Sequence, residues 1–142
     1  MRYLIDTNIF IYSTTDVISL CRDVYSILED PDTLLCMSAV SVRELIVAYR
    51  HKGFDIRRWR TPEELVKSIT DEFFISVLPV GIDVMKTYAR LQLNEREEHN
   101  DPCDHLIISQ ALTERMPLIS SDRKFLYYRD QGLDLIFNGD ED

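Results

Sequence analysis

Two acidic residues near opposite ends of the chain each follow a short apolar run of strand character. Asp6 ends the run at residues 2–5, and Asp122 comes shortly after the run at residues 117–120. Ligands of open parallel sheets gather outside the carboxyl ends of the strands, so both acids would face one crevice if their strands are neighbours. Carboxylate oxygens are ligands that Mg²⁺ and other hard cations prefer. The pattern predicts a metal site assembled by folding.

Glu44 and Asp104 lie on predicted helices, on faces that otherwise look buried. The helix of Glu44 opens with Ser38 as its expected N-cap, and no basic residue stands three or four positions from Glu44. Asp104 is followed on its helix face by Ile107 and Ile108. A buried carboxylate is costly to desolvate, and like-charged neighbours favour its protonation. A divalent cation would supply the missing compensation.

The aspartates also have purely structural explanations. Asp101 before Pro102 is typical of a helix start, with Asp101 as N-cap and Asp104 interacting with the helix dipole. Asp6 and Asp122 are also residue types that form turns. Asp101 is therefore interpreted either as a cap or as a direct or water-mediated support of the metal. The joint occurrence of the four acids is what favours a metal site.

Four blocks of sequence, taken in order, span nearly the whole chain. They are Tyr3-Leu4-Ile5-Asp6-Thr7-Asn8, then Ser38-Ala39-Val40-Ser41-Val42-Arg43-Glu44-Leu45, then the segment from His99 to Ala111 that contains Asp101-Pro102-Cys103-Asp104-His105, and Pro117-Leu118-Ile119-Ser120-Ser121-Asp122. With these blocks the chain resembles a PIN-domain ribonuclease, most closely the toxin component of a VapBC-type toxin–antitoxin pair. One departure is Cys103, where related sequences often carry an aromatic residue.

The resemblance implies a set of site residues. The catalytic and metal-binding acids map onto Asp6, Glu44, Asp104 and Asp122. The residues expected to support them are Asn8, Asp101 and Ser120. Asp6, Asp104 and Asp122 are the candidates for direct or water-mediated ligands, whereas Glu44 would either bind metal or accept a proton from the attacking water.

The implied activity is that of an endoribonuclease that uses Mg²⁺ or Mn²⁺. The metal would lower the pKa of a bound water, orient it toward the phosphorus and neutralise charge on the phosphoryl oxygens. Cleavage of transfer or ribosomal RNA would leave a 5′-phosphate and a 3′-hydroxyl. The resemblance also implies two partners, a VapB-like antitoxin and a second copy of the chain in a homodimer.

The charge of the chain is unusual for a protein that cuts RNA. Its formal net charge is −9, which repels a polyanion at long range. Basic residues are concentrated between Arg50 and Arg60, interleaved with Phe54 and Trp59, so that cations could hold phosphates and rings could stack on bases. The alternative is a solvated helix connection with Trp59 in the core. The candidate RNA-binding residues are Arg50, Lys52, Arg57, Arg58, Arg60 and Arg123.

A length of 142 residues predicts a single nuclease domain over residues 1–142, with 138–142 as a mobile acidic tail. Strands alternate with helices, which favours an α/β fold with a central parallel β-sheet flanked by α-helices. The expected strands are 2–6, 33–37, 73–78, 117–120 and 133–137. The expected helices are 7–13, 17–30, 38–51, 61–72, 81–98, 102–115 and 122–128.

The remaining features bear on location and on other functions. We expect a cytoplasmic protein without a membrane anchor, because we find no signal peptide and no long apolar run, and the cysteines number three. His99, Cys103 and His105 match no usual zinc spacing. A phosphatase with Asp6 as nucleophile would want an acid where Asn8 stands. A catalytically silent PIN-fold module that binds RNA or protein is the other alternative.

Overall fold

The computed structural model describes residues 1–141 and shows an α/β fold around a five-stranded sheet. The strands are β1 (Arg2–Ile5), β2 (Leu34–Ser38), β3 (Ser76–Leu78), β4 (Leu118–Ser120) and β5 (Leu135–Phe137). They lie in the order β3-β2-β1-β4-β5, and every neighbouring pair is parallel. The predicted fold class is confirmed. Because β1 and β4 are neighbours, the strand ends that precede Asp6 and Asp122 lie at the same edge of the sheet.

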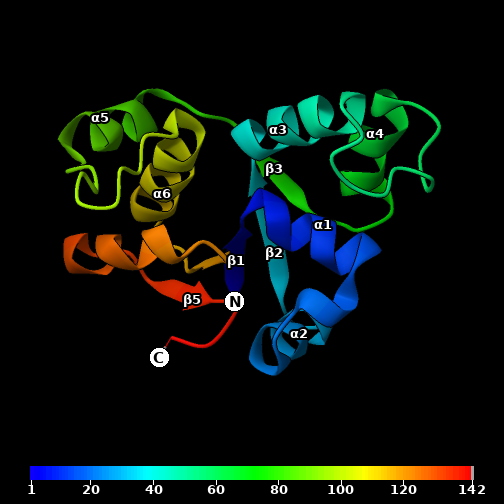
Figure 1. The fold of residues 1–142 in the computed structure, drawn as a ribbon, viewed down its shortest axis with the longest axis horizontal. Coiled ribbons are helices and arrows are strands. Elements are labelled where there is room, and N and C mark those ends of the chain that lie inside the picture. Colours follow the sequence, from blue (N-terminus) through cyan, green and yellow to red (C-terminus); the bar gives the residue numbers. More distant parts are fainter. Residues whose placement is uncertain (142) are drawn as a thin grey trace.

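Helices cover both faces of this sheet. They are α1 (Thr7–Thr15), the 3-10 helix η1 (Val17–Ser19), α2 (Arg22–Glu29), α3 (Ala39–Arg50), α4 (Pro62–Asp71), α5 (Ile82–Arg90), α6 (Pro102–Glu114) and the 3-10 helix η2 (Arg123–Gln131). In Figure 1, α1 to α4 lie on one side of the strands, and α5, α6 and the orange η2 lie on the other. The site must therefore draw its residues from both sides.

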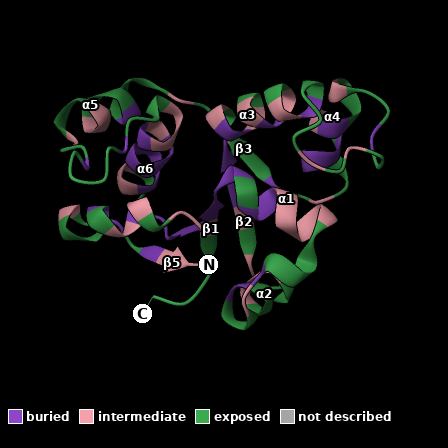
Figure 2. Ribbon diagram, viewed as in Figure 1, coloured by how far each residue is buried: buried purple, intermediate pink, exposed green. Residues whose placement is uncertain are grey.

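Two hydrophobic clusters form the core, one on each face of the sheet. Successive residues of a strand point to opposite faces, and on β1 Ile5 joins one cluster while Leu4 joins the other. The first cluster includes Phe10 and Trp59, and the second includes Tyr128. Figure 2 shows the buried residues along the central strands and on the helices beside them. Burial on both faces holds the strand ends at fixed positions.

Side-chain caps start the helices that carry the acids. Ser38 accepts a hydrogen bond from the N–H of Val40 and starts α3, as predicted. Asp101 accepts from the N–H of Cys103, and Pro102 occupies the first helical position of α6. The cap interpretation of Asp101 is confirmed. Both caps place the first turn of their helix next to the carboxyl end of the sheet.

Two predicted helices are wrong in extent. The helix expected at 81–98 ends at Arg90, and residues 91–101 form a loop. The side chain of Gln131 bonds both the N–H and the carbonyl of Gln92, so tertiary contacts replace the helical hydrogen bonds there. The helix expected at 17–30 is split into η1 and α2. Ile18, which lies in η1, is 96% exposed.

The end of the chain is more closely held than expected. Of the predicted tail 138–142, Asn138 is buried and its side chain bonds Ser19, Cys21 and Ser121, so the mobility predicted for this residue does not fit its contacts. Asp142 lies outside the described residues. None of the helices between residues 1 and 141 is long and apolar enough to span a membrane.

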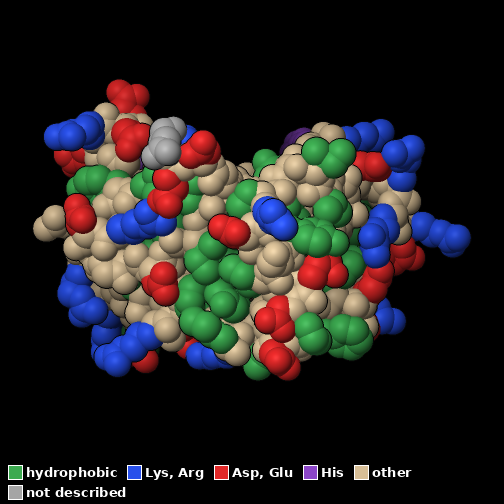
Figure 3. Space-filling model, turned by 90° about the horizontal axis from the view of Figure 1, so that it is seen from below, with side chains coloured by type: hydrophobic (Ala, Val, Ile, Leu, Met, Phe, Trp, Pro, Cys, Tyr) green, Lys and Arg blue, Asp and Glu red, His purple; other side chains and the backbone are tan. Residues whose placement is uncertain are grey.

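The surface carries both signs of charge despite the net excess of acids. On the face shown in Figure 3, acidic and basic side chains are interspersed around an area where hydrophobic side chains are exposed. An overall charge of −9 is therefore compatible with basic patches at particular places.

Candidate metal centre

The four predicted acids line one cleft at the carboxyl end of the sheet. The cleft has a volume of about 370 Å³. Its lining residues come from β1 and α1, from α3 and the turn after it, and from the starts of α6 and η2: Asp6, Thr7, Asn8, Ile11, Glu44, Ala48, Gly53, Asp101, Asp104 and Asp122. Folding therefore brings together carboxylates that are separated by up to 116 positions in the sequence.

Three of these acids lie close enough to share one ion. Asp6, Glu44 and Asp104 each offer a carboxylate oxygen, and the three oxygens lie within 4.8 Å of one another. Asp122 belongs to an overlapping group, in which its carboxylate, that of Asp104 and a ring nitrogen of His99 lie within the same distance. Asp104 is common to both groups and stands at the centre of the site.

Asp6 and Asp122 are joined through one hydroxyl. Asp6 is 5% exposed, and its two oxygens accept hydrogen bonds from the N–H of Thr7 (2.8 Å) and the hydroxyl of Ser120 (2.8 Å). The oxygen of Ser120 in turn accepts from the N–H of Asp122 over 3.1 Å. Asp122 also caps η2 through the N–H of Lys124. Asp6 caps α1 and Asp122 caps η2, and both also line the cleft.

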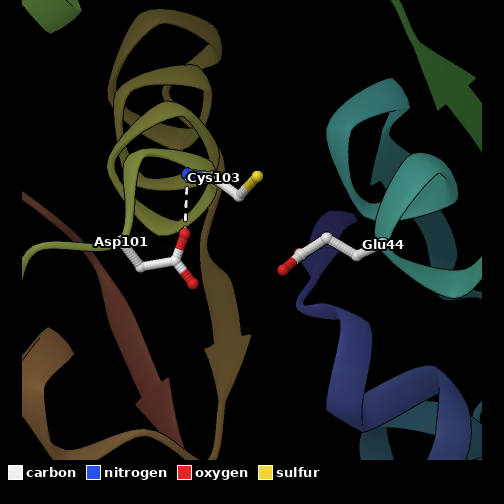
Figure 4. A group of neighbouring side chains, drawn as sticks. All are labelled: Glu44, Asp101 and Cys103. Atoms are coloured by element: carbon white, nitrogen blue, oxygen red, sulfur yellow. Dashed lines mark hydrogen bonds between the residues drawn. The ribbon is translucent and has the colours of Figure 1, made fainter. Parts of the chain in front are cut away.

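Glu44 approaches from the opposite wall of the cleft. It lies on α3, and its Oε1 accepts a hydrogen bond from the hydroxyl of Thr7 over 2.7 Å. Figure 4 shows Glu44 extending toward Asp101 and Cys103 at the start of α6, and their ligand atoms also lie within 4.8 Å of one another. Thr7 was not among the predicted site residues, although its place directly after Asp6 was a signal for it.

His99 is the other residue that sequence reasoning missed. It was considered only as a zinc ligand with Cys103 and His105, yet it is 2% exposed and its Nε2 lies 3.0 Å from Asp104 Oδ2. His105 turns away from the cleft, and its Nε2 lies 2.8 Å from the carbonyl oxygen of His99. The three residues do not form a shared ligand group. His99 falls between the predicted helices 81–98 and 102–115, so the pattern gave it no position and its contact with Asp104 was not visible.

The crowding of acids changes their protonation. Burial raises the pKa of Asp6 from 3.8 to about 7, the charge of Asp104 adds to this, and the hydrogen bonds from Ser120 and Thr7 oppose it. Burial, followed by the charges of Asp101, Glu44 and Asp122, raises the pKa of Asp104 to about 7. Burial likewise raises the pKa of Glu44. It lowers the pKa of His99, which favours a neutral ring.

This donor set fits a hard divalent cation. The three-acid group supplies only carboxylate oxygens, which suit Mg²⁺ and Mn²⁺. Burial and the neighbouring acids raise the pKa values of Asp6 and Asp104, and at Asp104 the charge of Lys124 offsets this only in part. The residues that would hold the ion are Asp6, Glu44 and Asp104, with Asp122 beside them.

A family comparison covers most of the chain. The family model of the PIN domain matches residues 3–130. The chain belongs to the PIN domain family. A comparison with curated proteins gives no significant match.

Several solved structures similar to this PIN domain come from toxin–antitoxin complexes. VapBC2 from Rickettsia felis, bound to a promoter DNA fragment, has a TM-score of 0.70 and 22% identity over 96% of this chain and 98% of that chain. VapBC-1 from nontypeable Haemophilus influenzae gives 0.65 and 21%, again over 96% and 98%. VapBC-5 from Mycobacterium tuberculosis gives 0.63 and 24% over 96% of each chain. At these identities the likeness establishes the fold.

The predicted RNA-binding residues of the PIN domain do not form one patch. Arg57 pairs with Asp55 over 2.7 Å, and Arg58 pairs with Glu72. Arg50 lines a separate groove between α3 and α4, and Arg123 donates to the carbonyl of Asp140. Lys52 and Arg60 are exposed. Lys52 lies nearest in sequence to a cleft residue, because Gly53 lines the cleft.

Trp59 belongs to the core and is not a base-stacking surface. It is 4% exposed, its ring N–H donates to the hydroxyl of Ser68, and its ring lies 6.3 Å from that of Phe10. The alternative interpretation of the basic stretch, with Trp59 packed in the core, is therefore confirmed. Phe54 is partly buried against the same cluster. The exposed residues of the segment are its basic residues together with Gly53 and Asp55, and neither aromatic ring is fully exposed.

Proposed function

We propose that this PIN domain is a Mg²⁺- or Mn²⁺-dependent endoribonuclease and the toxin of a VapBC-like toxin–antitoxin pair. The observation that carries the proposal is the meeting of Asp6, Glu44 and Asp104 within 4.8 Å in an open cleft. These acids come from a strand end and from helices on opposite faces of the sheet, so chance proximity along the chain does not explain them. Membership of the PIN family supports the same function.

The residues of the cleft have separable roles in the proposed reaction. A bound Mg²⁺ or Mn²⁺ would supply activation of a water and stabilisation of charge on the phosphate. Asp6, held through both oxygens, and Asp104 would hold the ion. Glu44 accepts a single hydrogen bond among the described residues, from Thr7, and is the candidate to accept the proton of the attacking water. Asp122 and Ser120 close the site from the side of β4.

The substrate is proposed to be RNA, transfer or ribosomal, cut to a 5′-phosphate and a 3′-hydroxyl. Lys52, which precedes the cleft residue Gly53 in the sequence, would contact phosphate, whereas Arg57 and Arg58 are paired with Asp55 and Glu72. The cytoplasm is the proposed place of action, which suits the free thiols of Cys21, Cys36 and Cys103.

The proposed partners are a VapB-like antitoxin and a second copy of the chain. Support comes from similar structures that were crystallised as toxin–antitoxin complexes, including one from Klebsiella pneumoniae with a TM-score of 0.59, at 18% identity over 97% of this chain and 98% of that chain. Exposed apolar side chains such as Ile18 and Phe74 are available for such contacts. Co-expression with the neighbouring reading frames and size measurement of the purified complex tests both partners.

The decisive experiment for the activity is RNA cleavage with matched variants. Wild-type protein, Asp6→Asn and Asp83→Asn are incubated with total RNA in Mg²⁺, Mn²⁺ or EDTA, and the new ends are identified. Asp83 is an exposed acid on α5, so its variant carries the same charge change outside the cleft. We expect metal-dependent cleavage by wild type and Asp83→Asn, and none by Asp6→Asn. Equal cleavage by all three would point to a contaminant, and none by wild type would favour the silent binding module.

The phosphatase alternative gains nothing from the geometry. Both oxygens of Asp6 already accept hydrogen bonds, and the residue two positions later is Asn8 instead of an acid. A search for a phosphoaspartate at Asp6 after incubation with phosphate esters should therefore find none.

A further inference from the structure

Behind Asp104, a chain of three hydrogen bonds runs from the cleft into the protein. His99 Nε2 lies 3.0 Å from Asp104 Oδ2, His99 Nδ1 lies 2.9 Å from the hydroxyl of Tyr128, and the N–H of Asn94 donates to that hydroxyl over 3.1 Å. Asn94, His99 and Tyr128 are 1%, 2% and 0% exposed. Water therefore does not compete for these groups, and each proton in the chain must find its acceptor within the protein.

The direction of each bond follows from counting protons. The N–H of Asn94 can only donate, so the oxygen of Tyr128 accepts that bond. The hydroxyl proton of Tyr128 then has His99 Nδ1 as its acceptor. A neutral imidazole carries one N–H, which is left on Nε2 and faces a carboxylate that accepts.

The opposite tautomer leaves two conflicts. With the proton on Nδ1, the ring would donate to Tyr128, whose own proton would have no acceptor in this chain of bonds. When Asp104 is ionised, the lone pair of Nε2 would also meet a lone pair of the carboxylate at 3.0 Å. The first conflict is fully buried, and both are costly. The arrangement of donors therefore selects the Nε2–H tautomer.

We propose that His99 is a positioning residue, held by Tyr128 as a donor to Asp104 so that the carboxylate keeps the orientation in which it meets Asp6 and Glu44. The inference rests on the proposed metal centre, because the orientation of Asp104 matters to the reaction only if this acid binds the ion. It also excludes a second role for His99. Although its ring nitrogen lies within 4.8 Å of oxygens of Asp104 and Asp122, a protonated Nε2 has no lone pair for a metal.

The backbone supports the same position. His99 sits at the end of the loop 91–101, after Glu98, whose φ of 53° turns the chain. Its carbonyl oxygen lies 2.8 Å from His105 Nε2, and the two rings meet edge to face at 4.8 Å between centroids. The ring of His99 is thus located by α6 as well as by Tyr128.

Nuclear magnetic resonance tests the tautomer directly. The protein has three histidines, so ¹⁵N-labelled protein gives three imidazole spin systems, and the exposed His51 is assigned with His51→Gln. At a pH above the pKa of about 7 of Asp104, we expect the metal-free wild type to show His99 with a protonated Nε2 and an unprotonated Nδ1. A ring protonated at Nδ1 overturns the proposal.

Tyrosine variants test the positioning. Tyr128→Phe keeps the buried ring and removes the hydroxyl, while Tyr127→Phe removes the hydroxyl of a 41% exposed neighbour. We expect Tyr128→Phe to weaken Mn²⁺ binding, measured by calorimetry, by about 10- to 100-fold, and Tyr127→Phe to bind as wild type does. Equal Mn²⁺ affinity of the two variants overturns the positioning role, whatever their stability.

Histidine variants supply a rescue test. The amide nitrogen of Gln reaches as far as Nε2 and can donate to Asp104, whereas the shorter Asn cannot. His99→Gln should therefore bind Mn²⁺ about tenfold or more tightly than His99→Asn. If the two bind equally, the donor at this place has no positioning effect.

These outcomes separate the positioning role from the proposed function. Wild-type protein that binds Mn²⁺ but cuts no RNA would refute the ribonuclease while the tautomer and affinity measurements still decide the role of His99. Wild-type protein that binds no Mn²⁺ would overturn the metal centre and the positioning role together.

Discussion

The two walls of the cleft hold their acids in different ways. On the wall formed by α3, Glu44 accepts one hydrogen bond among the described residues, from the partly buried hydroxyl of Thr7. On the wall formed by α6, Asp104 is backed by the buried pair His99 and Tyr128. The longer side chain of Glu44 therefore keeps more rotational freedom than Asp104. One wall suits a fixed ligand and the other a group that exchanges protons or moves with the substrate.

The walls also differ in the charge that surrounds them. The turn after α3 brings the exposed Lys52 close in sequence to the cleft residue Gly53. The α6 wall gathers acids, since the charges of Asp101 and Asp122 both raise the pKa of Asp104. An ion would be held mainly from the α6 wall, and a phosphate would approach over the α3 wall. The predictions that follow test this division.

The largest effect is expected at the acid shared by both ligand groups. Asp104→Asn should reduce RNA cleavage about a thousandfold or more, because several kcal/mol of charge stabilisation depend on the ion that it helps to hold. Cleavage of a labelled RNA under single-turnover conditions measures this. The exposed variant Asp83→Asn serves as the charge-matched control, and a loss smaller than that of Thr7→Val would contradict the central place given to Asp104.

A large effect is also expected on the stability of the metal-free protein. The folded-state pKa of about 7 for Asp6 and Asp104 lies above the unfolded value of 3.8, so between these values the folded state binds more protons. Its free energy of unfolding should therefore fall as the pH rises through this window, by on the order of 3 kcal/mol. Urea denaturation in EDTA at a series of pH values measures the fall.

The variant Asp6→Asn and the addition of Mn²⁺ to wild type identify the source of this pH dependence. Asp6→Asn should flatten it and raise the stability of the metal-free protein near neutral pH, and added Mn²⁺ should restore stability to wild type. A metal-free wild type that becomes more stable as the pH rises from about 4 to about 7 would show that the acids do not crowd one another.

A smaller effect is expected on the α3 wall. Thr7→Val keeps the shape of the side chain and removes the hydroxyl that holds Glu44, so cleavage should fall about tenfold, equivalent to one hydrogen bond to a charged group. Thr7→Ser retains the hydroxyl and is the matched control. Thr7→Val and Tyr128→Phe are compared in the same Mn²⁺-binding measurement. If Thr7→Val weakens Mn²⁺ binding as much as Tyr128→Phe does, the two walls are equally dependent on their supports.

The smallest effect concerns the approach of RNA. Lys52→Gln should weaken RNA binding by less than about tenfold and lower the slope of log K against log salt by about one, leaving the single-turnover rate at saturation unchanged. Lys86→Gln on α5 removes an equal charge on the other side of the sheet and should change neither quantity. Equal effects of the two variants would mean that phosphate contact is not confined to the α3 wall.

Local signals in the sequence were sufficient for the helix caps and strand ends around the cleft. Asp6 and Asp122 follow short apolar runs, Ser38 and Asp101 are capping residues, and each was placed correctly because caps and strand ends depend on a few neighbouring residues. For Asp101, the cap interpretation and a place in the cleft do not exclude each other. Asp101 caps α6 and lines the cleft as well.

The errors have a common cause. The helix predicted at 81–98 ends early because Gln131 and Tyr128, more than thirty positions away, bond the backbone of Gln92 and Asn94. Trp59 looked like a stacking surface in a basic stretch, but its environment is set by Phe10 and Ser68. Local patterns do not contain the partners that decide such positions.

The sequence by itself determined the alternation of strands and helices, the helix starts and the identity of the acids, because capping and hydrophobic periodicity act over a few residues. Only the tertiary structure decided which oxygens meet in the cleft, that His99 backs Asp104, and that Thr7 holds Glu44. Those contacts depend on the order of strands in the sheet and on a loop held by distant side chains. Neither the strand order nor the conformation of this loop can be inferred from the residues that adjoin the site residues in the sequence.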